Sequence, residues 1–301
     1  MTSTVGGALR AAIERLATAG LPASDAEELL SRLLGVGRGD LRTRAGDPLA
    51  PGTLATLERH LARRLAGEPV QYVTGRAAFR HLDLAVDPRV LIPRPETEWL
   101  VEAVLEHLGR GDWSRRPPRV LDLGTGSGCI ALAVASERPD ARVLAVDASA
   151  DALAVATANA VAVRVADRVT FAHGDWFAAV APDDRFDVIV SNPPYISWSE
   201  AAELPADVRE HEPHAALFAD DDGLADLRTI VDEAPRHLLA GGLLALELAE
   251  MRAEAVAAWL EGAHDWQSVE LRDDLSGRPR MLLARRERGP AIAPAQWGEE
   301  G

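Results

Sequence analysis

The chain has 301 residues, of which 47% are apolar, and a formal net charge of −15. This length suffices for one large domain and a smaller one, and the acidic charge opposes broad binding to nucleic acid. The single cysteine, Cys129, excludes an internal disulfide. The N-terminal segment has no apolar core of signal-peptide length, and no apolar run in the chain approaches the length of a membrane span. We therefore expect a soluble, cytoplasmic protein with no membrane partner.

The first 75 residues carry the apolar spacing of short amphipathic helices. The segments 8–16, 24–35 and 53–67 each repeat aliphatic side chains at helical intervals. Ser24 and Glu27 have the spacing of a capping box, and Gly35 suits a helix end. The pattern predicts a small helical bundle over residues 1–75.

Residues 76–92 change to an apolar period of two. "FRHLDLAV" (79–86) alternates, and "RVLI" (89–92) follows Asp87 and Pro88. We predict a β-hairpin here that links the two domains.

From residue 93 onward a helix is followed by alternating strand and helix patterns. This order predicts an α/β fold with a doubly wound, mainly parallel sheet and an antiparallel edge strand over residues 93–288. Residues 289–301 are rich in Gly, Pro and Ala and are expected to form a flexible tail. The predicted strands are "RVLDLG", "RVLAVD", "RVTFAHGD", "RFDVIVSN", "GGLLALEL", "QSVELRDD" and "RPRMLLARR".

The first of these strands runs into a glycine-rich turn, "LDLGTGSG". At this place in a doubly wound fold, glycines let a ligand approach the backbone beside a helix N-terminus. A glycine turn without a ligand is the plainer alternative. Asp122 is expected to be a buried carboxylate that orders the loop or meets a ligand ammonium group. The predicted cofactor site includes Asp122, Gly124, Thr125, Gly126, Ser127 and Gly128.

Acidic residues end the next two strands. Asp147 is placed to accept hydrogen bonds from both ribose hydroxyls of a nucleoside, although it could also cap the following helix. Asp175 can meet an adenine amino group, and Trp176 can pack on the base or belong to the core. Cys129 stands where a dinucleotide fingerprint has its third glycine, so these features fit S-adenosylmethionine (SAM) at least as well as NAD.

Other cofactor classes lack their sequence marks. The chain contains no lysine, which excludes a P-loop, and its His and Cys spacing suggests no metal site.

The strand "FDVIV" ends in Ser191-Asn192-Pro193-Pro194-Tyr195-Ile196. If this strand lies beside the first one, the tetrapeptide reaches the crevice next to the glycine loop. The amide oxygen of Asn192 and the carbonyl of Pro193 are then two rigid acceptors for a planar NH₂ group, because proline fixes the backbone. Tyr195 offers a face for stacking. A Pro-Pro turn that simply ends the strand is the alternative.

This chemistry fits methyl transfer to a conjugated amino group. Such a nitrogen is a poor nucleophile, and two acceptors return lone-pair density to it. Attack on the sulfonium methyl of SAM then requires mainly positioning. We therefore assign catalysis to Asn192, Pro193, Pro194 and Tyr195.

Together, "DLGTGSG" and "NPPY" are typical of amino-methyltransferases that act on DNA bases, ribosomal guanine or protein glutamine. Several further stretches resemble the peptide chain release factor N5-glutamine methyltransferase family (HemK/PrmC), over roughly residues 5–285. They are "GEPVQYVTG", "LIPRPETE", "GDWF", "SNPPYI", "EPHAALFADDDGL" and "RDDLSGRPR".

The resemblance implies a class I SAM-dependent methyltransferase with an N-terminal domain that docks the substrate. It implies transfer of a methyl group to the side-chain amide nitrogen (N5) of the glutamine in the Gly-Gly-Gln loop of peptide chain release factors. Family roles carry onto Gly124 to Gly128, Asp147, Trp176 and Asn192 for SAM, and onto Asn192 to Tyr195 for glutamine. Ala249 and Met251 depart from the glycine and glutamine that are usual there, although Glu247 is kept.

The charge of the segment after the tetrapeptide bears on the substrate. Residues 197–234 hold eleven acidic side chains and two arginines, which would repel phosphate and attract a basic protein loop. A solvated acidic loop is the plainer interpretation. We expect no direct contact with nucleic acid. One alternative function is amino-methylation of an adenine or guanine base, which would need a basic face on the protein. Another is that of a catalytically silent SAM-binding adaptor.

Overall fold

The computed structural model describes residues 3–274 and 276–287. The predicted tail, residues 289–301, lies outside them. The chain divides into two compact units, which we describe separately. The first contains the residues up to Ala77 together with 86–88 and 204–212, and the second contains 78–85, 89–203 and the residues from Pro213 onward.

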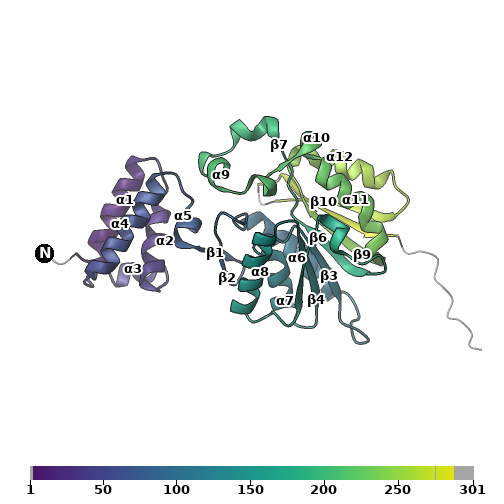
Figure 1. The fold of residues 1–301 in the computed structure, drawn as a ribbon, viewed down its shortest axis with the longest axis horizontal. Helices are drawn as coiled ribbons and strands as arrows, with labels where there is room; N and C mark the ends of the chain where they lie inside the picture. Colours follow the sequence, from purple (N-terminus) through teal and green to yellow (C-terminus); the bar gives the residue numbers. More distant parts are fainter. Residues whose placement is uncertain (1–2, 275, 288–301) are drawn as a thin grey trace, which may run out of the picture. The chain divides into compact units, whose positions relative to one another are not determined.

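The first unit is a helical bundle, as the apolar spacing predicts (Figure 1). Its core is a cluster of aliphatic side chains that includes the fully buried Leu16, Leu29 and Leu61. Its helices are α1 (Val5–Thr18), α2 (Ala23–Leu34), α3 (Asp40–Thr43), α4 (Pro51–Leu65), α5 (Val70–Thr74) and α9 (Ala206–His211).

The predicted capping box of α2 is wrong. The N-cap residue is Pro22, whose extended backbone starts the helix at Ala23 without a side-chain cap. Ser24 therefore falls inside the first turn, where its hydroxyl cannot take the N-cap role. The predicted end is correct, because Gly35 adopts the left-handed conformation at φ 64°.

A buried arginine holds the short helix α9 within this unit. Arg64 on α4 is 6% exposed, and its Nε donates to Asp25 Oδ2 on α2 at 2.8 Å. Its Nη2 lies 3.5 Å from Asp207 Oδ2 on α9. Because a buried guanidinium needs compensating charge, this ion pair ties residues that are distant in sequence.

The predicted hairpin is shorter than its sequence pattern. It consists of β1 (Arg76–Phe79) and β2 (Leu82–Ala85), joined by a turn in which Arg80 has φ 51°. Residues 89–92 form no strand, contrary to the prediction, because Pro88 has no N–H to continue a ladder.

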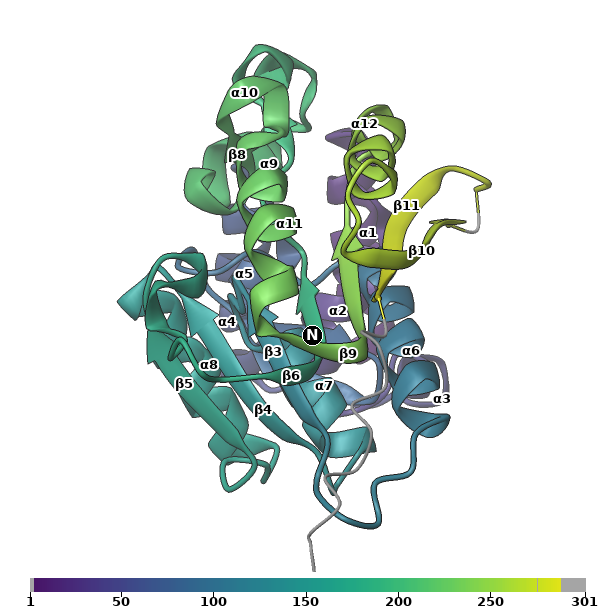
Figure 2. The ribbon, with the colours of Figure 1, turned by 90° about the vertical axis from the view of Figure 1, so that its right-hand side faces the viewer.

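The second unit contains a seven-stranded sheet in the order β10-β11-β9-β6-β3-β4-β5 (Figure 2). The strands β9, β6, β3, β4 and β5 are parallel, which confirms the doubly wound sheet. The reversed strand, β11, pairs antiparallel with both β9 and β10 and so lies one place inside the edge. The strands are β3 (Arg119–Leu123), β4 (Arg142–Asp147), β5 (Val169–His173), β6 (Phe186–Ser191), β9 (Leu238–Glu247), β10 (Trp266–Asp273) and β11 (Pro279–Arg286).

Helices cover both faces of this sheet. One face packs against α6 (Pro95–Gly109), α7 (Cys129–Glu137) and α8 (Ala150–Ala162). The other packs against the 3₁₀ helix η1 (Trp176–Ala179), α11 (Ala225–His237) and α12 (Glu250–Glu261). In β6, Val188 and Val190 join the first core and Ile189 the second, as strand alternation requires. No helix within the described part of the chain is long and apolar enough to cross a membrane.

The segment after β6 is built from short elements. They are β7 (Ile196–Ser197), η2 (Trp198–Glu203), η3 (His214–Ala216), β8 (Phe218–Ala219) and α10 (Asp220–Gly223), and β7 pairs with β8 in parallel. Since β6 lies directly beside β3, the residues that follow these two strands meet at one edge of the sheet.

Candidate active site

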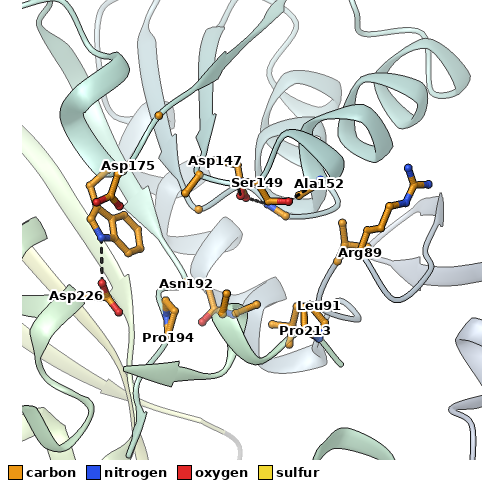
Figure 3. Close-up of a pocket in the computed structure, with 18 residues that line it drawn as sticks. Arg89, Leu91, Asp147, Ser149, Ala152, Asp175, Asn192, Pro194, Pro213 and Asp226 are labelled. Atoms are coloured by element: carbon orange, nitrogen blue, oxygen red, sulfur yellow. Dashed lines mark hydrogen bonds between the residues drawn. The ribbon is translucent and has the colours of Figure 1, made fainter. Parts of the chain in front are cut away.

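A cavity of about 350 Å³ lies at the carboxyl ends of the parallel strands (Figure 3). Its walls come from the loops after β3, β4, β5 and β6, from the segment before α6, and from η3 and α11. Among the predicted site residues, it is lined by Gly124, Gly126, Asp147, Asp175, Trp176, Asn192 and Pro194.

The glycine loop presents bare backbone to this cavity. Gly124 and Gly126 adopt left-handed conformations at φ 70° and 55°, and a Cβ added at Gly126 would meet no atom within 4 Å. Gly128 has a different role, because its Cβ would meet Leu132 at 3.1 Å and Ala156 at 3.2 Å. The third glycine thus permits α7 and α8 to pack closely, and it does not line the cavity.

Asp122 orders the loop from below, which is one of the two roles expected for it. Its Oδ2 accepts the Thr125 hydroxyl at 2.6 Å and the Ala131 amide at 3.1 Å. Complete burial raises the pKa of this carboxyl to about 7. Thr125 and Ser127 are also buried and do not line the cavity, so neither side chain is placed to contact a ligand there.

Asp147 connects the glycine loop to the start of α8. Its Oδ2 accepts the Gly126 amide and its Oδ1 accepts the Ser149 amide, each at 2.8 Å. The α8 N-cap is Ser149, whose hydroxyl accepts from Ala152, so the alternative of Asp147 as the helix cap is wrong. Each carboxylate oxygen keeps a second lone pair, as a ribose acceptor requires.

An indole closes another side of the cavity. Trp176 has φ 44°, and its Nε1 donates to Asp226 Oδ1 at 3.0 Å (Figure 3). A Cβ at Gly124 would lie 3.5 Å from the indole, so the ring packs on the glycine loop. Trp176 also contacts the apolar core, as its plainer interpretation requires. Packing of the ring on a base stays a prediction.

Sequence reasoning missed Asp226. It stands in the first turn of α11 with no motif around it, and the cavity includes it. Burial raises the pKa of its carboxyl, and neighbouring Asp175 adds to the effect.

The side-chain amide of Asn192 is oriented by hydrogen bonds. Its Nδ2 donates to Thr97 Oγ1 at 3.1 Å, and the Thr97 hydroxyl donates to Glu247 Oε2 at 2.6 Å. Thr97 and Glu247 are each 1% exposed. The amide oxygen of Asn192 is thereby left for the cavity, which the residue lines.

The other three residues of the tetrapeptide differ in whether they line the cavity. Pro194 lines the cavity, whereas Pro193 is buried and Tyr195 is not among the lining residues. The Tyr195 hydroxyl donates to Glu247 Oε1 at 3.3 Å. Stacking of a substrate on this ring stays a prediction.

Residues before α6 and in η3 also line the cavity and carried no role derived from the sequence. Arg89, Val90 and Leu91 belong to the segment predicted as a strand, and only the motif "LIPRPETE" pointed toward it. Pro213, Ala215 and Ala216 lie in "EPHAALFADDDGL", a stretch that the sequence singled out only as a likeness.

The two departures after β9 lie outside the lining of the cavity. Ala249 is the N-cap of α12 with φ −76° and ψ 146°, a backbone that any residue adopts, so the chain does not require glycine there. Met251 is 69% exposed. Glu247 accepts hydrogen bonds from Thr97 and Tyr195 in this chain.

The groups that line the cavity suit a cationic nucleoside cofactor. Bare glycine backbone, the Asp147 carboxylate and an indole surround one cavity, and Asp147, Asp175 and Asp226 give it an acidic lining. A sulfonium and an ammonium group would be favoured by these charges. Among the described residues, no group of three or more His, Cys, Asp or Glu side chains could hold a metal ion.

Comparison with known proteins identifies both units. The "PrmC N-terminal domain" family profile matches residues 7–75, and the "Methyltransferase small domain" profile matches residues 98–206. A release factor glutamine methyltransferase of Cereibacter sphaeroides is 44% identical over 92% of this chain and 97% of its own length. One of Bordetella pertussis is 46% identical over 88% and 96%.

Solved structures share the fold of the second unit. The 16S rRNA N2 G1207 methyltransferase of Thermus thermophilus, in complex with AdoMet and guanosine, superposes with a TM-score of 0.50 at 22% identity. It covers 70% of this chain and 50% of its own. This likeness establishes a methyltransferase fold and nothing finer.

Proposed function

Because the chain belongs to the family of release factor glutamine methyltransferases, we propose that it methylates the side-chain amide nitrogen (N5) of the glutamine in the Gly-Gly-Gln loop of peptide chain release factors, with SAM as methyl donor. SAM supplies an electrophilic methyl group on a sulfonium sulfur. The amide nitrogen gains that methyl group and releases one proton to water, and S-adenosylhomocysteine remains.

The cofactor assignment rests on the lining of the cavity. Gly124 and Gly126 offer backbone, and the Asp147 carboxylate keeps lone pairs for ribose hydroxyls. Trp176 and Asp175 form the wall expected for the base. These residues come from three successive loops of the sheet, as the doubly wound fold provides.

The single observation that carries the proposal is the orientation of Asn192. Its NH₂ group is bound to Thr97, so its carbonyl oxygen faces the cavity that also contains the glycine loop and Asp147. An acceptor at this place suits a substrate that presents N–H groups. Holding a glutamine amide there turns its nitrogen into a better nucleophile and aligns it for in-line attack.

Two observations support a protein substrate: the names of similar proteins and the acidic charge of one segment of this chain. The relatives are named for release factors, and the acidic segment 197–234 opposes a phosphate backbone. We place substrate docking partly on the helical bundle of residues 1–75, which the PrmC N-terminal profile matches.

The test is transfer of radiolabelled methyl from SAM to purified release factor, with ribosomal RNA and DNA offered in parallel. We expect label on the release factor, lost when the loop glutamine is replaced by alanine. Peptide mass spectrometry would place the methyl group on that glutamine. Label on nucleic acid alone would overturn the substrate and leave the amino-methyltransferase chemistry in place.

Two variants connect the activity to the cavity. Asn192→Ala should lower turnover by about 100-fold and affect SAM affinity less, because it removes an acceptor for the reacting amide. Val161→Ala is the matched control, because Val161 is 65% exposed and remote from the cavity lining. Equal losses of turnover and SAM affinity in Asn192→Ala would contradict the role of this acceptor.

A further inference from the structure

A continuous set of hydrogen bonds runs from the catalytic asparagine to a buried carboxylate. Asn192 Nδ2 donates to Thr97 Oγ1 at 3.1 Å, and Thr97 Oγ1 donates to Glu247 Oε2 at 2.6 Å. Tyr195 donates its hydroxyl to the other oxygen, Oε1, at 3.3 Å. The set joins the first turn of α6, the end of β9 and the tetrapeptide after β6.

In each hydrogen bond of this set, the donor and the acceptor are determined while Glu247 is ionised. A threonine hydroxyl has one proton, and an ionised carboxylate can only accept. While Glu247 is ionised, the Thr97 proton points to it, and the Thr97 oxygen is left only as an acceptor. Asn192 must then turn its NH₂ group toward Thr97 and its carbonyl oxygen toward the cavity.

We propose that Thr97 and ionised Glu247 are positioning residues that fix which end of the Asn192 amide faces the substrate. The inference rests on the proposed function, because it concerns the acceptor for the glutamine NH₂ group. Neither residue lines the cavity, and both act through Asn192.

Protonation of Glu247 would reverse the direction. A neutral carboxyl group can donate to Thr97 Oγ1, which frees the Thr97 proton for the carbonyl oxygen of Asn192. The asparagine amide can then turn over and present NH₂ to the cavity, where it meets the NH₂ of the substrate. Two donors facing each other exclude the productive geometry.

The titration of Glu247 falls in an accessible range. Burial raises its pKa to about 7, although the hydrogen bond from Thr97 and the charge of Arg280 oppose the rise. The ionisable groups around it are Arg280 on β11, Glu96 on α6, Tyr195 in the tetrapeptide and the buried Cys129 thiol on α7, whose pKa is raised to about 12.

The test compares turnover numbers at saturating SAM and release factor from pH 5.5 to 9. The wild-type kcat should rise about tenfold per unit up to a pH near 7 and then level, since the ionised carboxylate is the productive form. Thr97→Val keeps the shape and removes the hydroxyl; its kcat should fall by about 100-fold, with the KM for SAM within about twofold. Thr97→Ser should restore most of the rate.

Glu247→Gln gives the decisive readout. Its side-chain amide does not titrate, so we expect a pH profile without the acid limb near pH 7. Thermal unfolding and SAM binding, measured on each variant, separate this result from misfolding. A Thr97→Val enzyme with wild-type kcat, or an acid limb that persists in Glu247→Gln, would overturn the inference and leave the proposed function standing. A wild-type enzyme that does not label the loop glutamine would instead refute the proposed function.

Discussion

Gly223 is the position at which the structure predicts a large effect from one added methyl group. It ends α10 at φ 81°, and an ideal Cβ there would lie 2.4 Å from the carbonyl oxygen of Tyr195 and 2.9 Å from its carbonyl carbon. The same Cβ would lie 3.1 Å from Arg252 Nε, and Arg252 is held in place by a 2.6 Å ion pair with Glu200. The tetrapeptide backbone or the end of α10 must therefore move, and we expect the tetrapeptide to be displaced.

The size of the movement follows from these contacts. Ordinary van der Waals contact begins at 3.4 Å, so in Gly223→Ala the separation between the added Cβ and the Tyr195 carbonyl oxygen must grow by about 1 Å. A misplacement of about 1 Å in a catalytic group can cost about 100-fold in rate. The left-handed backbone adds a strain of about 1–2 kcal/mol to the folded state.

Gly35→Ala separates strain from displacement. Gly35 has φ 64° and no atom within 4 Å of its added Cβ, so this variant has similar strain without a clash. Gly35→Ala should lose about 1–2 kcal/mol of unfolding free energy in urea because of its backbone strain. Gly223→Ala should lose more, because the clash adds to a similar strain. Only Gly223→Ala should lose turnover in the methyl-transfer assay, with SAM affinity by calorimetry within about threefold of wild type. Equal turnover in the two folded variants would refute the argument.

Three further predictions concern acidic residues. Asp147→Asn should weaken SAM binding by about tenfold or more, because an amide cannot accept both the Gly126 and the Ser149 N–H groups as the carboxylate does. Calorimetry would measure the affinity for SAM, with Asp167→Asn as the control because its side chain is 73% exposed. Asp226→Ala should lower SAM affinity several-fold by releasing the Trp176 indole, and an unchanged affinity would separate the ring from cofactor binding. Burial raises the pKa of Asp122 to about 7 from 3.8. The folded state therefore binds this proton more tightly than the unfolded chain does. The stability that this group contributes is lost as the pH rises from about 4 to about 7. Unfolding free energies in urea should therefore decline less over that range in Asp122→Asn than in wild type, and parallel curves would contradict the assignment.

The sequence predicted the sheet well, because its signals are local and strong. The alternation in β6 places Val188 and Ile189 on opposite faces, and every residue of this strand is buried. Short apolar runs separated by helical patterns leave few arrangements other than a doubly wound sheet. The place of β11 inside the edge was not predictable, since it depends on the return of the last hairpin and on no residue pattern.

Local errors arose where a neighbouring proline overrides a pattern. Ser24 and Glu27 have capping-box spacing, but with Pro22 as N-cap the helix starts two residues earlier. Residues 89–92 look like a strand, but Pro88 interrupts the pairing that such a strand needs. At Pro88 the missing information is a backbone hydrogen bond that proline does not allow.

The site was predicted by residue type more fully than by role. Gly128 and Thr125 belong to the motif, yet the first permits helix packing and the second bonds to Asp122 beneath the loop. Asp226 was missed because its indole partner lies 50 residues away in the sequence. A motif identifies which residues gather at a turn, whereas the side of the backbone that each one faces comes only from the fold.

The tetrapeptide shows this limit most clearly, because both of its polar side chains converge on Glu247. Asn192 reaches this carboxylate through Thr97, 95 residues earlier in the chain, and Tyr195 reaches it directly. One buried carboxylate thereby holds the two ends of the tetrapeptide, and its own position depends on β9 and not on the residues that follow. Substitution at the exposed Met251 leaves those bonds untouched, whereas loss of the Glu247 carboxylate would release both ends at once.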